Sequence, residues 1–319
     1  MMFPLDPLTR LSRLRLFLAA SLVWLLPVRA LVFIQSGDPS FNATAPTGDL
    51  AGSGWQYQGN WGGLLGTPVA PGFFLTAKHG GGAVGNSFTF QGTPYVTTAK
   101  FDHPSADLTL WRVAGTFPEY ALLYTGTDEV GKELVVFGRS AVRGAEVTVM
   151  GASPADLRGW EWGNTGGGTL RWGANQVDAT PTVSGAQYLR ATFSFSGGPN
   201  EATLATGDSG GGVFLRDGGI WKLAGINYAV EAEFRTAADG TTFRAAIFDA
   251  GGLYHNTGSG FALLTDMSGD IQASFYSTRV SSYAGWIQGF TAVPEPAGSA
   301  WMVAAGLTGF GAWRRWGRR

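Results

Sequence analysis

Among the motifs that could carry chemistry, one contains a histidine and another contains an aspartate. His79 follows an apolar, strand-like run, residues 74–77, and precedes three consecutive glycines. An imidazole takes and returns a proton near neutral pH, which suits His79 to general acid–base chemistry. Asp107 stands at the entry of another apolar run, residues 108–113. Its carboxylate could accept a hydrogen bond from an imidazole N–H and so orient the ring, and Asp102 is a second candidate for this role.

A third motif places a serine between glycines. Ser209 lies in the sequence Thr-Gly-Asp-Ser-Gly-Gly-Gly, residues 206–212. Glycines allow a tight turn that exposes the hydroxyl and lets backbone N–H groups converge where an oxyanion would form. The other interpretation is a plain glycine-rich turn, just as an isolated histidine is usually a surface or core residue. The three motifs therefore indicate a nucleophilic site only in combination.

Short strand-like runs surround these motifs. They are rich in Val, Ile, Phe, Tyr, Trp and Thr and are separated by Gly or Asp, which is typical of an all-β barrel or sandwich. The expected strands are residues 72–77, 87–91, 95–101, 108–113, 134–137, 146–150, 188–195, 212–215, 221–228, 242–249 and 272–280. Residues 217–219 predict a hairpin turn, and residues 281–287 predict a short helix with a serine cap. Residues 154–180 are expected to form an irregular insertion.

Composition limits the classes of protein to consider. The chain has 319 residues, and its 45% hydrophobic and 13% aromatic content is enough for a core, which excludes disorder along the whole length. The net charge of −1 gives no argument for nucleic-acid binding. The absence of cysteine excludes thiol catalysis, Cys-ligated zinc, iron–sulfur clusters and disulfides. We expect no cofactor and no metal site.

Taken together, the motifs resemble those of the trypsin-like (chymotrypsin-fold) serine peptidases. The order is Thr-Ala-x-His at 76–79, Asp-Leu-x-Leu at 107–110 and Gly-Asp-Ser-Gly-Gly at 207–211. Residues 277–287 are similar to the last strand and terminal helix of that family, so the resemblance spans residues 75–287. It implies an all-β fold of two packed six-stranded antiparallel barrels with a short C-terminal helix and an active site between the barrels.

The resemblance also implies a role for each matched residue. Ser209 would attack the scissile carbonyl, His79 would take the serine proton and pass it to the leaving amine, and Asp107 would hold His79 in the correct tautomer. The backbone N–H groups of Gly207 and Ser209 would form the oxyanion hole. Asp208 would pair with a buried α-amino terminus.

The sequence departs from the family pattern in several places. His79 and Asp107 are only 28 residues apart, so loops of the first barrel must be short. Lys78 replaces a small residue, and the family disulfides are missing. Thr203 stands where an acid would form the base of the primary substrate pocket, and Tyr228 is expected on the pocket wall. We therefore expect poor cleavage after Arg or Lys and a preference for small or apolar residues.

The amino-terminal segment, residues 1–30, predicts a secretory signal peptide. Arginines precede an apolar run, residues 16–28, and the small residues around Ala30 suit cleavage. The alternative is an N-terminal membrane anchor. Cleavage after Ala30 would start the mature chain at Leu31, which could supply the amino terminus for Asp208 without a separate activation step.

The carboxyl-terminal segment, residues 291–319, predicts a sorting signal with a transmembrane helix. Pro-Glu-Pro at 294–296 is followed by the uncharged residues 297–313 and then by four arginines. This three-part order resembles the PEP-CTERM signal of Gram-negative bacteria, and the alternative is an ordinary membrane anchor. The resemblance implies that an exosortase-type enzyme and the membrane recognise residues 294–319, with a final location in the cell envelope or extracellular matrix.

Residues 31–290 are thus expected to form one exported serine peptidase domain. It would hydrolyse protein or peptide substrates through an acyl-enzyme on Ser209. Two alternatives remain: a catalytically inactive protein of the same fold in the extracellular matrix, and a β-rich surface protein that binds polysaccharide through some of its 12 tryptophans.

Overall fold

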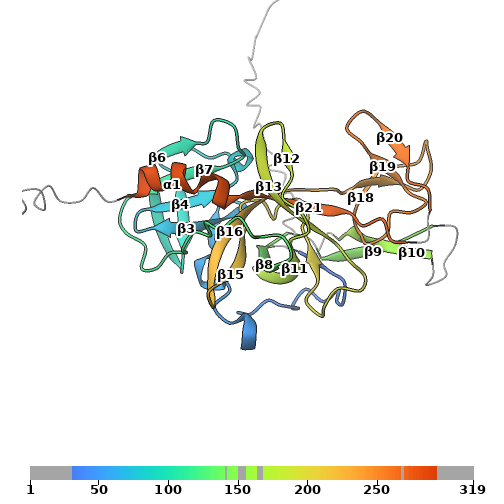
Figure 1. The fold of residues 1–319 in the computed structure, drawn as a ribbon, viewed down its shortest axis with the longest axis horizontal. Helices are drawn as coiled ribbons and strands as arrows, with labels where there is room; N and C mark the ends of the chain where they lie inside the picture. Colours follow the sequence, from blue (N-terminus) through green and yellow to red (C-terminus); the bar gives the residue numbers. More distant parts are fainter. Residues whose placement is uncertain (1–30, 141, 150–155, 164–167, 267–268, 293–319) are drawn as a thin grey trace, which may run out of the picture.

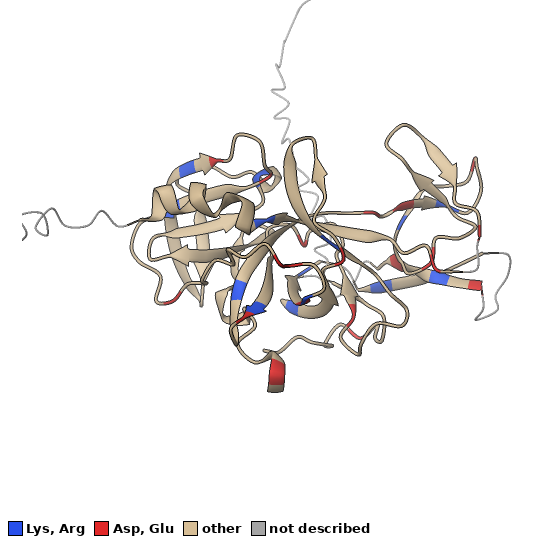
Figure 2. Ribbon diagram, viewed as in Figure 1, with Lys and Arg blue, Asp and Glu red and all other residues tan. Residues whose placement is uncertain are grey.

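The computed structural model describes residues 31–140, 142–149, 156–163, 168–266 and 269–292. The expected signal peptide and the sorting segment from residue 293 onward lie outside these residues. Strands dominate the described part, which has one α-helix, α1 (Ala284–Thr291). Within it, no helix is both long and apolar enough to cross a membrane. Charged residues are scattered over the ribbon rather than gathered on one element (Figure 2).

A closed six-stranded barrel forms one end of the molecule (Figure 1). Its strands are β2 (Gly59–Trp61), β3 (Leu64–Ala70), β4 (Phe73–Thr76), β5 (Ser87–Phe90), β6 (Thr93–Asp102) and β7 (Thr109–Val113). Aromatic side chains fill it, with Phe74 and Phe88 stacked at 3.9 Å between ring centroids. Gly59 is required beside them because a Cβ there would overlap the Phe88 ring. A six-stranded barrel was expected, and the expected strands at 72–77, 87–91, 95–101 and 108–113 correspond to β4 to β7, whereas β2 and β3 were not among the expected strands.

A seven-stranded antiparallel sheet forms the middle of the molecule, in the order β11-β8-β15-β16-β21-β13-β12. Its strands are β8 (Glu133–Gly138), β11 (Arg171–Gln176), β12 (Thr182–Val183), β13 (Ala186–Thr192), β15 (Gly212–Asp217), β16 (Ile220–Val230) and β21 (Ser274–Arg279). No ladder closes this sheet in the described residues. The Asn175 side chain instead donates to the carbonyl of Thr192, at 2.8 Å, and bridges β11 to β13.

Strand β8 contributes alternate residues to two apolar cores. One core lies between the closed barrel and the middle sheet, and the other lies on the opposite face of the middle sheet. Val135 and Phe137 pack against barrel residues such as Leu75, whereas Leu134 and Val136 face the other core. Successive side chains of a strand point to opposite faces, so one apolar strand can serve two cores. The barrel and the middle sheet are therefore packed directly on each other.

A third, six-stranded sheet stands at the far end from the barrel, in the order β20-β19-β17-β18-β10-β9 (Figure 1). Its strands are β9 (Arg143–Thr148), β10 (Leu157–Trp162), β17 (Glu233–Arg235), β18 (Phe243–Ile247), β19 (Tyr254–Asn256) and β20 (Phe261–Leu263). The prediction of a second six-stranded barrel needs correction, because the described residues form a seven-stranded sheet and this third sheet in its place. The expected irregular insertion at 154–180 is also wrong, because its described residues include β10 and β11.

Shorter elements lie outside these sheets. Strand β1 (Val32–Phe33) pairs with β14 (Ala202–Thr203), which leads into the serine motif. A 3₁₀ turn, Val280–Tyr283, precedes α1. The predicted serine cap is absent: α1 begins at Ala284, no side-chain oxygen accepts its first N–H groups, and the Ser281 hydroxyl donates to Glu129 Oε1, at 2.6 Å.

The buried carboxyl group of Glu201, directly before β14, should make the stability of the protein depend on pH. Glu201 accepts hydrogen bonds from the Ser194 N–H, at 2.9 Å, and from Asn175 Nδ2, at 3.1 Å. Burial raises the pKa of Glu201 from its ordinary 4.5 to about 8, and the hydrogen bond from Ser194 only partly opposes this. A carboxyl with a raised folded-state pKa stabilises the fold below its unfolded-state pKa, and this contribution is lost as the pH rises through the folded-state value.

We therefore expect the free energy of unfolding to fall between about pH 4.5 and pH 8, and to fall less in Glu201→Gln, whose side chain does not titrate. Urea unfolding of both proteins across this range measures the difference. Declines of equal size in the two proteins would contradict the prediction.

Candidate active site

Two neighbouring barrel strands bring His79 and Asp107 together. Strand β4 pairs antiparallel with β7, and the last pair is Thr76 with Thr109. The end of β4 and the start of β7 consequently lie at the same edge of the barrel. His79 follows β4 in a 3₁₀ turn, Lys78–Gly80, and Asp107 stands two residues before the start of β7. The pairing therefore converts a separation of 28 residues into contact.

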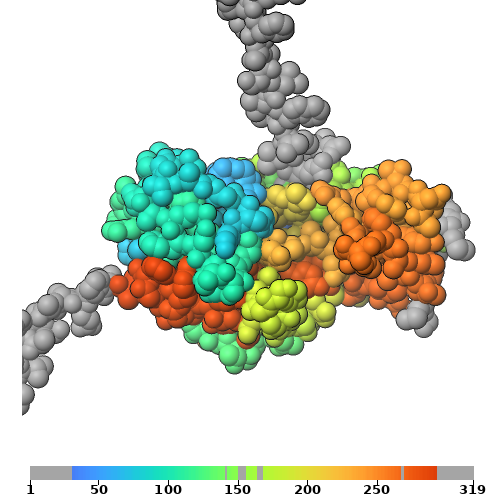
Figure 3. All heavy atoms as spheres, turned by 90° about the horizontal axis from the view of Figure 1, so that it is seen from above, coloured from blue at the N-terminus to red at the C-terminus, as the bar shows by residue number. Residues whose placement is uncertain are grey.

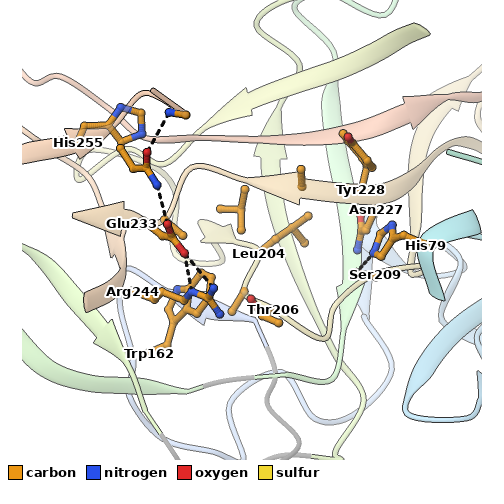
Figure 4. A pocket seen from close by; sticks show the side chains of 16 residues that line it. His79, Trp162, Leu204, Thr206, Ser209, Asn227, Tyr228, Glu233, Arg244 and His255 are labelled. Carbon is orange, nitrogen blue, oxygen red and sulfur yellow. Dashed lines mark hydrogen bonds and ion pairs between the residues drawn. The ribbon is translucent and has the colours of Figure 1, made fainter. Parts of the chain in front are cut away.

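The three predicted residues form one hydrogen-bonded chain. Asp107 Oδ2 lies 2.6 Å from His79 Nδ1, and Asp107 Oδ1 accepts the His79 backbone N–H at 2.8 Å. His79 Nε2 lies 2.7 Å from Ser209 Oγ (Figure 4). Since a carboxylate only accepts hydrogen bonds, we assign the imidazole hydrogen to Nδ1. His79 Nε2 is then free to accept the proton of the Ser209 hydroxyl.

The competing acid, Asp102, lies elsewhere. Its carboxylate accepts a hydrogen bond from the Thr109 hydroxyl, at 2.5 Å, and pairs with Lys100, at 3.1 Å. The neighbouring His103 is a packing residue: its Nδ1 accepts the Ala106 N–H, at 3.0 Å, and its ring contacts Tyr283. Burial lowers the pKa of His103 and keeps this ring neutral. The structure thus places Asp107, and not Asp102, against His79.

Both the closed barrel and the middle sheet form hydrogen bonds with the loop that carries Ser209. The Leu65 N–H of the barrel donates to the Ser209 carbonyl, at 3.3 Å. From the middle sheet, the Asn227 carbonyl accepts the Gly210 N–H at 3.1 Å, and Asn227 Nδ2 donates to the Asp208 carbonyl at 3.1 Å. Gly210 has a φ of 79°, and a Cβ on it would overlap the Leu65 carbonyl. Glycine is therefore required directly after the serine.

The buried carboxylate of Asp208 holds the same loop through backbone hydrogen bonds. It accepts the backbone N–H groups of Arg139, Ser140 and Ala205, each at 2.8 Å. Burial raises the pKa of Asp208 to about 6, although these hydrogen bonds and the positive charge of Arg171 favour the ionised form. The backbone bonds make Asp208 a structural anchor, irrespective of any amino terminus.

The predicted oxyanion donors are free in the described part of the chain. Among its hydrogen bonds, none uses the N–H of Gly207 or of Ser209, whereas those of Asp208 and Gly210 are bonded. Free N–H groups beside an exposed hydroxyl are what an oxyanion site needs.

A cleft of about 460 Å³ opens at Ser209 and runs toward the third sheet (Figure 4). Small and apolar residues line its middle: Leu204, Ala205, Thr206, Ala229, Val230 and Ala232. Tyr228 lies on its wall, as expected, with its ring edge toward His79 and its face stacked on Tyr188. Thr203, in contrast, is buried in β14 opposite Val32 and does not line the cleft. The expectation for Thr203 therefore needs correction.

Other residues of the site were not foreseen from the sequence. Asn227 supports the serine loop, and Thr278 donates its hydroxyl to the Asp107 carbonyl, at 3.2 Å. The polar Asn227 directly after the apolar residues 223–226 is a signal that could have been used. The far wall of the cleft contains Trp162, Glu233 and Arg244 of the third sheet, which no motif indicated. In the described residues, no cluster of side chains could hold a metal ion.

No family model and no curated protein matches the sequence. Among solved structures, the chain is similar to neuropsin, a serine protease expressed in the limbic system of mouse brain. The two share 16% identity with a TM-score of 0.46, and the match covers 75% of this chain and 96% of neuropsin. This likeness does not establish family membership.

The geometry predicts which acid activates the serine. Replacing Asp107 by Asn should slow the reaction of Ser209 with a fluorophosphonate by orders of magnitude, because an amide no longer fixes the imidazole tautomer. Asp102→Asn is the matched control and should react close to the wild-type rate. Mass spectrometry of the labelled Ser209 peptide over time gives both rates. A slower reaction in Asp102→Asn than in Asp107→Asn would reverse the assignment.

Proposed function

We propose that the protein is a serine endopeptidase that hydrolyses peptide bonds through an acyl-enzyme on Ser209. The observation that supports this most strongly is the continuous chain from Asp107 through His79 to Ser209, at 2.6 and 2.7 Å, at the mouth of a cleft. An activated serine, a base and an orienting acid are the groups that acyl transfer requires.

The reaction follows from the positions of these groups. His79 Nε2 takes the hydroxyl proton as Ser209 Oγ attacks the carbonyl carbon, and the N–H groups of Gly207 and Ser209 stabilise the resulting oxyanion. His79 then gives the proton to the departing amine, which leaves an ester on Ser209. Water enters, passes a proton to His79 and releases the acid, which restores the serine. Asp107 stabilises the charged imidazole in both steps.

One edge of β16 offers a place for the peptide backbone. Strand β15 pairs with β16 only as far as Ile226, so residues 227–230 continue beyond it along the cleft. On that edge, no strand of the described chain pairs with residues 228–230. An extended peptide can add to such an edge through main-chain hydrogen bonds. This favours an unfolded segment or a loop as the substrate.

Specificity should follow the small, apolar lining near Ser209. Peptides with Ala, Val or Leu before the scissile bond should be cleaved at least about tenfold faster than those with Arg or Lys. A buried cation needs a paired carboxylate, and the acid that lines the described cleft, Glu233, lies at the end remote from Ser209 (Figure 4). Digestion of a peptide library by the wild type measures this preference.

Ser209→Ala is the control for contaminating proteases and should release no products. Cleavage by Ser209→Ala at the wild-type rate would refute the proposed function. Preferred turnover of Arg substrates by the wild type would refute the specificity alone.

We further propose that the enzyme is exported through residues 1–30 and retained through residues 294–319, by an exosortase-type enzyme in the envelope of a Gram-negative bacterium. The order of basic, apolar and small residues supports the first step, and the Pro-Glu-Pro, apolar and arginine order supports the second.

Removal of residues 1–30 would place a new amino group beside the serine loop. Leu31 is fully buried, and a Cβ on Gly138 would overlap both the Leu31 side chain and the Asp208 carboxylate. Leu31 and Asp208 therefore share one buried neighbourhood, where a new ammonium would have a carboxylate partner. We propose that cleavage after Ala30 creates this pair and stabilises the loop around Ser209.

A chain that begins at Leu31 should accordingly be more active and have a higher melting temperature than the same chain with Met-Gly in front. The two extra residues would have to leave the buried region and would prevent the ammonium from reaching Asp208. Peptide hydrolysis and thermal unfolding of the two chains measure the effect. Equal activity and equal stability would disprove the activation step and leave the proposed reaction intact.

A further inference from the structure

The third sheet forms the far end of the cleft that starts at Ser209. The space-filling view shows the closed barrel and the third sheet at opposite ends of the molecule, with the chain around residues 180–230 between them (Figure 3). The cleft is lined by His79 and Ser209 at one end and by Glu233, Arg244 and Asn256 at the other. The end with Ser209 thus lies against the barrel, and the charged residues of the other end come from β17, β18 and β19.

These charged residues form a row across three neighbouring strands. Glu233 and Arg244 are direct partners in the β17–β18 pair, and the register of β17 with β19 continues the row to Asn256. Cross-strand neighbours on one face of a sheet are close enough to interact. Continuing the β10–β18 register by one residue brings Trp162 opposite Arg244, and Figure 4 shows the two side chains together. Arg244 thus has Glu233 and Trp162 as its neighbours on the two adjacent strands.

Hydrogen bonds along the row orient the Arg244 guanidinium. The Gly258 N–H donates to Asn256 Oδ1, at 2.9 Å, and Asn256 Nδ2 donates to Glu233 Oε2, at 2.7 Å. Glu233 Oε1 accepts both Arg244 Nε, at 3.2 Å, and Arg244 Nη2, at 2.9 Å. Arg244 and Asn256 together lower the pKa of Glu233, so the carboxylate stays ionised. Both of its oxygens are therefore occupied.

The donors that remain belong to Arg244. Its side chain is 53% exposed, and a guanidinium has further N–H groups besides the two that Glu233 accepts. In the described part of the chain these groups have no partner. A ligand at this end of the cleft therefore meets free N–H donors of a guanidinium, while Glu233 already accepts three hydrogen bonds. Guanidinium donors of this kind favour a carboxylate over a cation.

The direction of the substrate follows from the proton transfer. The departing amine takes its proton from His79, so the carboxyl-terminal part of the substrate leaves on the barrel side of Ser209. Arg244 lies on the opposite side of Ser209 from His79 (Figure 4). The amino-terminal part of the substrate therefore extends toward the third sheet. Glu233 follows Tyr228 by five residues, so an extended peptide, at about 3.3 Å per residue, reaches the row within about five residues.

We propose that Arg244 forms a specificity subsite for an acidic side chain, Asp or Glu, located two to six residues before the scissile bond on its amino-terminal side. This inference rests on the proposed peptidase function and names the class of its substrates. A single position is favoured because the surface beyond Arg244 carries Glu146 and Glu161, which repel a second acid. The middle of the cleft is small and apolar, so the favoured substrate has small residues between this acid and the scissile bond.

The test uses fluorogenic alanine peptides in which one residue at a time, from the second to the sixth before the scissile bond, is Glu, Gln or Lys. Glu should raise kcat/KM over Gln about tenfold at one position, as expected for a charge-assisted hydrogen bond at a half-exposed site. In Arg244→Gln this ratio should fall to about one, and Arg244→Lys should retain part of it.

Arg235→Gln is the matched control, because Arg235 lies on the same sheet but bonds to Thr242 and does not line the cleft. It should keep the wild-type ratio. Equal rates for Glu and Gln at every position in the wild type, or an acid preference that survives in Arg244→Gln, would overturn the subsite.

A binding measurement separates this inference from the proposed reaction. The affinities of the Glu, Gln and Lys peptides for Ser209→Ala, determined by fluorescence anisotropy, do not depend on hydrolysis. Tighter binding of the Glu peptide than of the Gln peptide, lost in the double variant with Arg244→Gln, supports the subsite even if no peptide is cleaved. Equal affinities would overturn it, even if the wild type proves to be an active peptidase.

Discussion

The serine loop depends on two buried polar groups that hold it at the boundary between the lobes. Asp208 collects three backbone N–H groups beneath the loop, and Asn227 binds the backbone on either side of Ser209. A buried carboxylate is costly unless its lone pairs are satisfied, so this arrangement is stable in only one backbone conformation. Because Ser209 follows Asp208 directly, that conformation also determines where the hydroxyl points. The site then requires that the fold place His79 within hydrogen-bond distance of this hydroxyl.

The residues of the candidate site could be named from the sequence, but only by combining three motifs. His79 and Asp107 stand beside short apolar runs, whereas Ser209 stands between glycines, and the order of the three motifs resembles one peptidase family. The structure joins the three side chains in one hydrogen-bonded chain. The local pattern alone left both Asp107 and Asp102 as candidates, and only the family resemblance favoured Asp107. The choice depends on the register of β4 with β7 and on the hydrogen bond that Thr109 makes with Asp102, which are both properties of the folded barrel.

Four strands of the closed barrel, β4 to β7, could be predicted, because each is a short run of apolar, aromatic and β-branched residues within residues 73–113. Strands β2 and β3 were missed, because Gly, Asn, Thr and Pro interrupt residues 59–70. The third sheet could not be predicted, because it is assembled from two distant segments. Strands β9 and β10 come from residues 143–162, and β17 to β20 come from residues 233–263. Their meeting depends on the pairing of β10 with β18, which no local pattern shows. The misplacement of Thr203 has a similar origin, since the pairing of β14 with β1 draws its side chain into the interior.

The long-range pairing of β10 with β18 also affects the order in which the chain can fold. The barrel can form once residue 113 has been synthesised, whereas β10 has no partner on that side until residues 243–247 emerge. Until then Trp160 and Trp162, both nearly buried in the finished protein, stay exposed beside an open strand edge. Such an edge invites pairing with other chains, and contacts between distant residues form slowly. The third sheet, which forms the far wall of the cleft, therefore folds late. The nascent chain is most prone to aggregate before β10 pairs with β18.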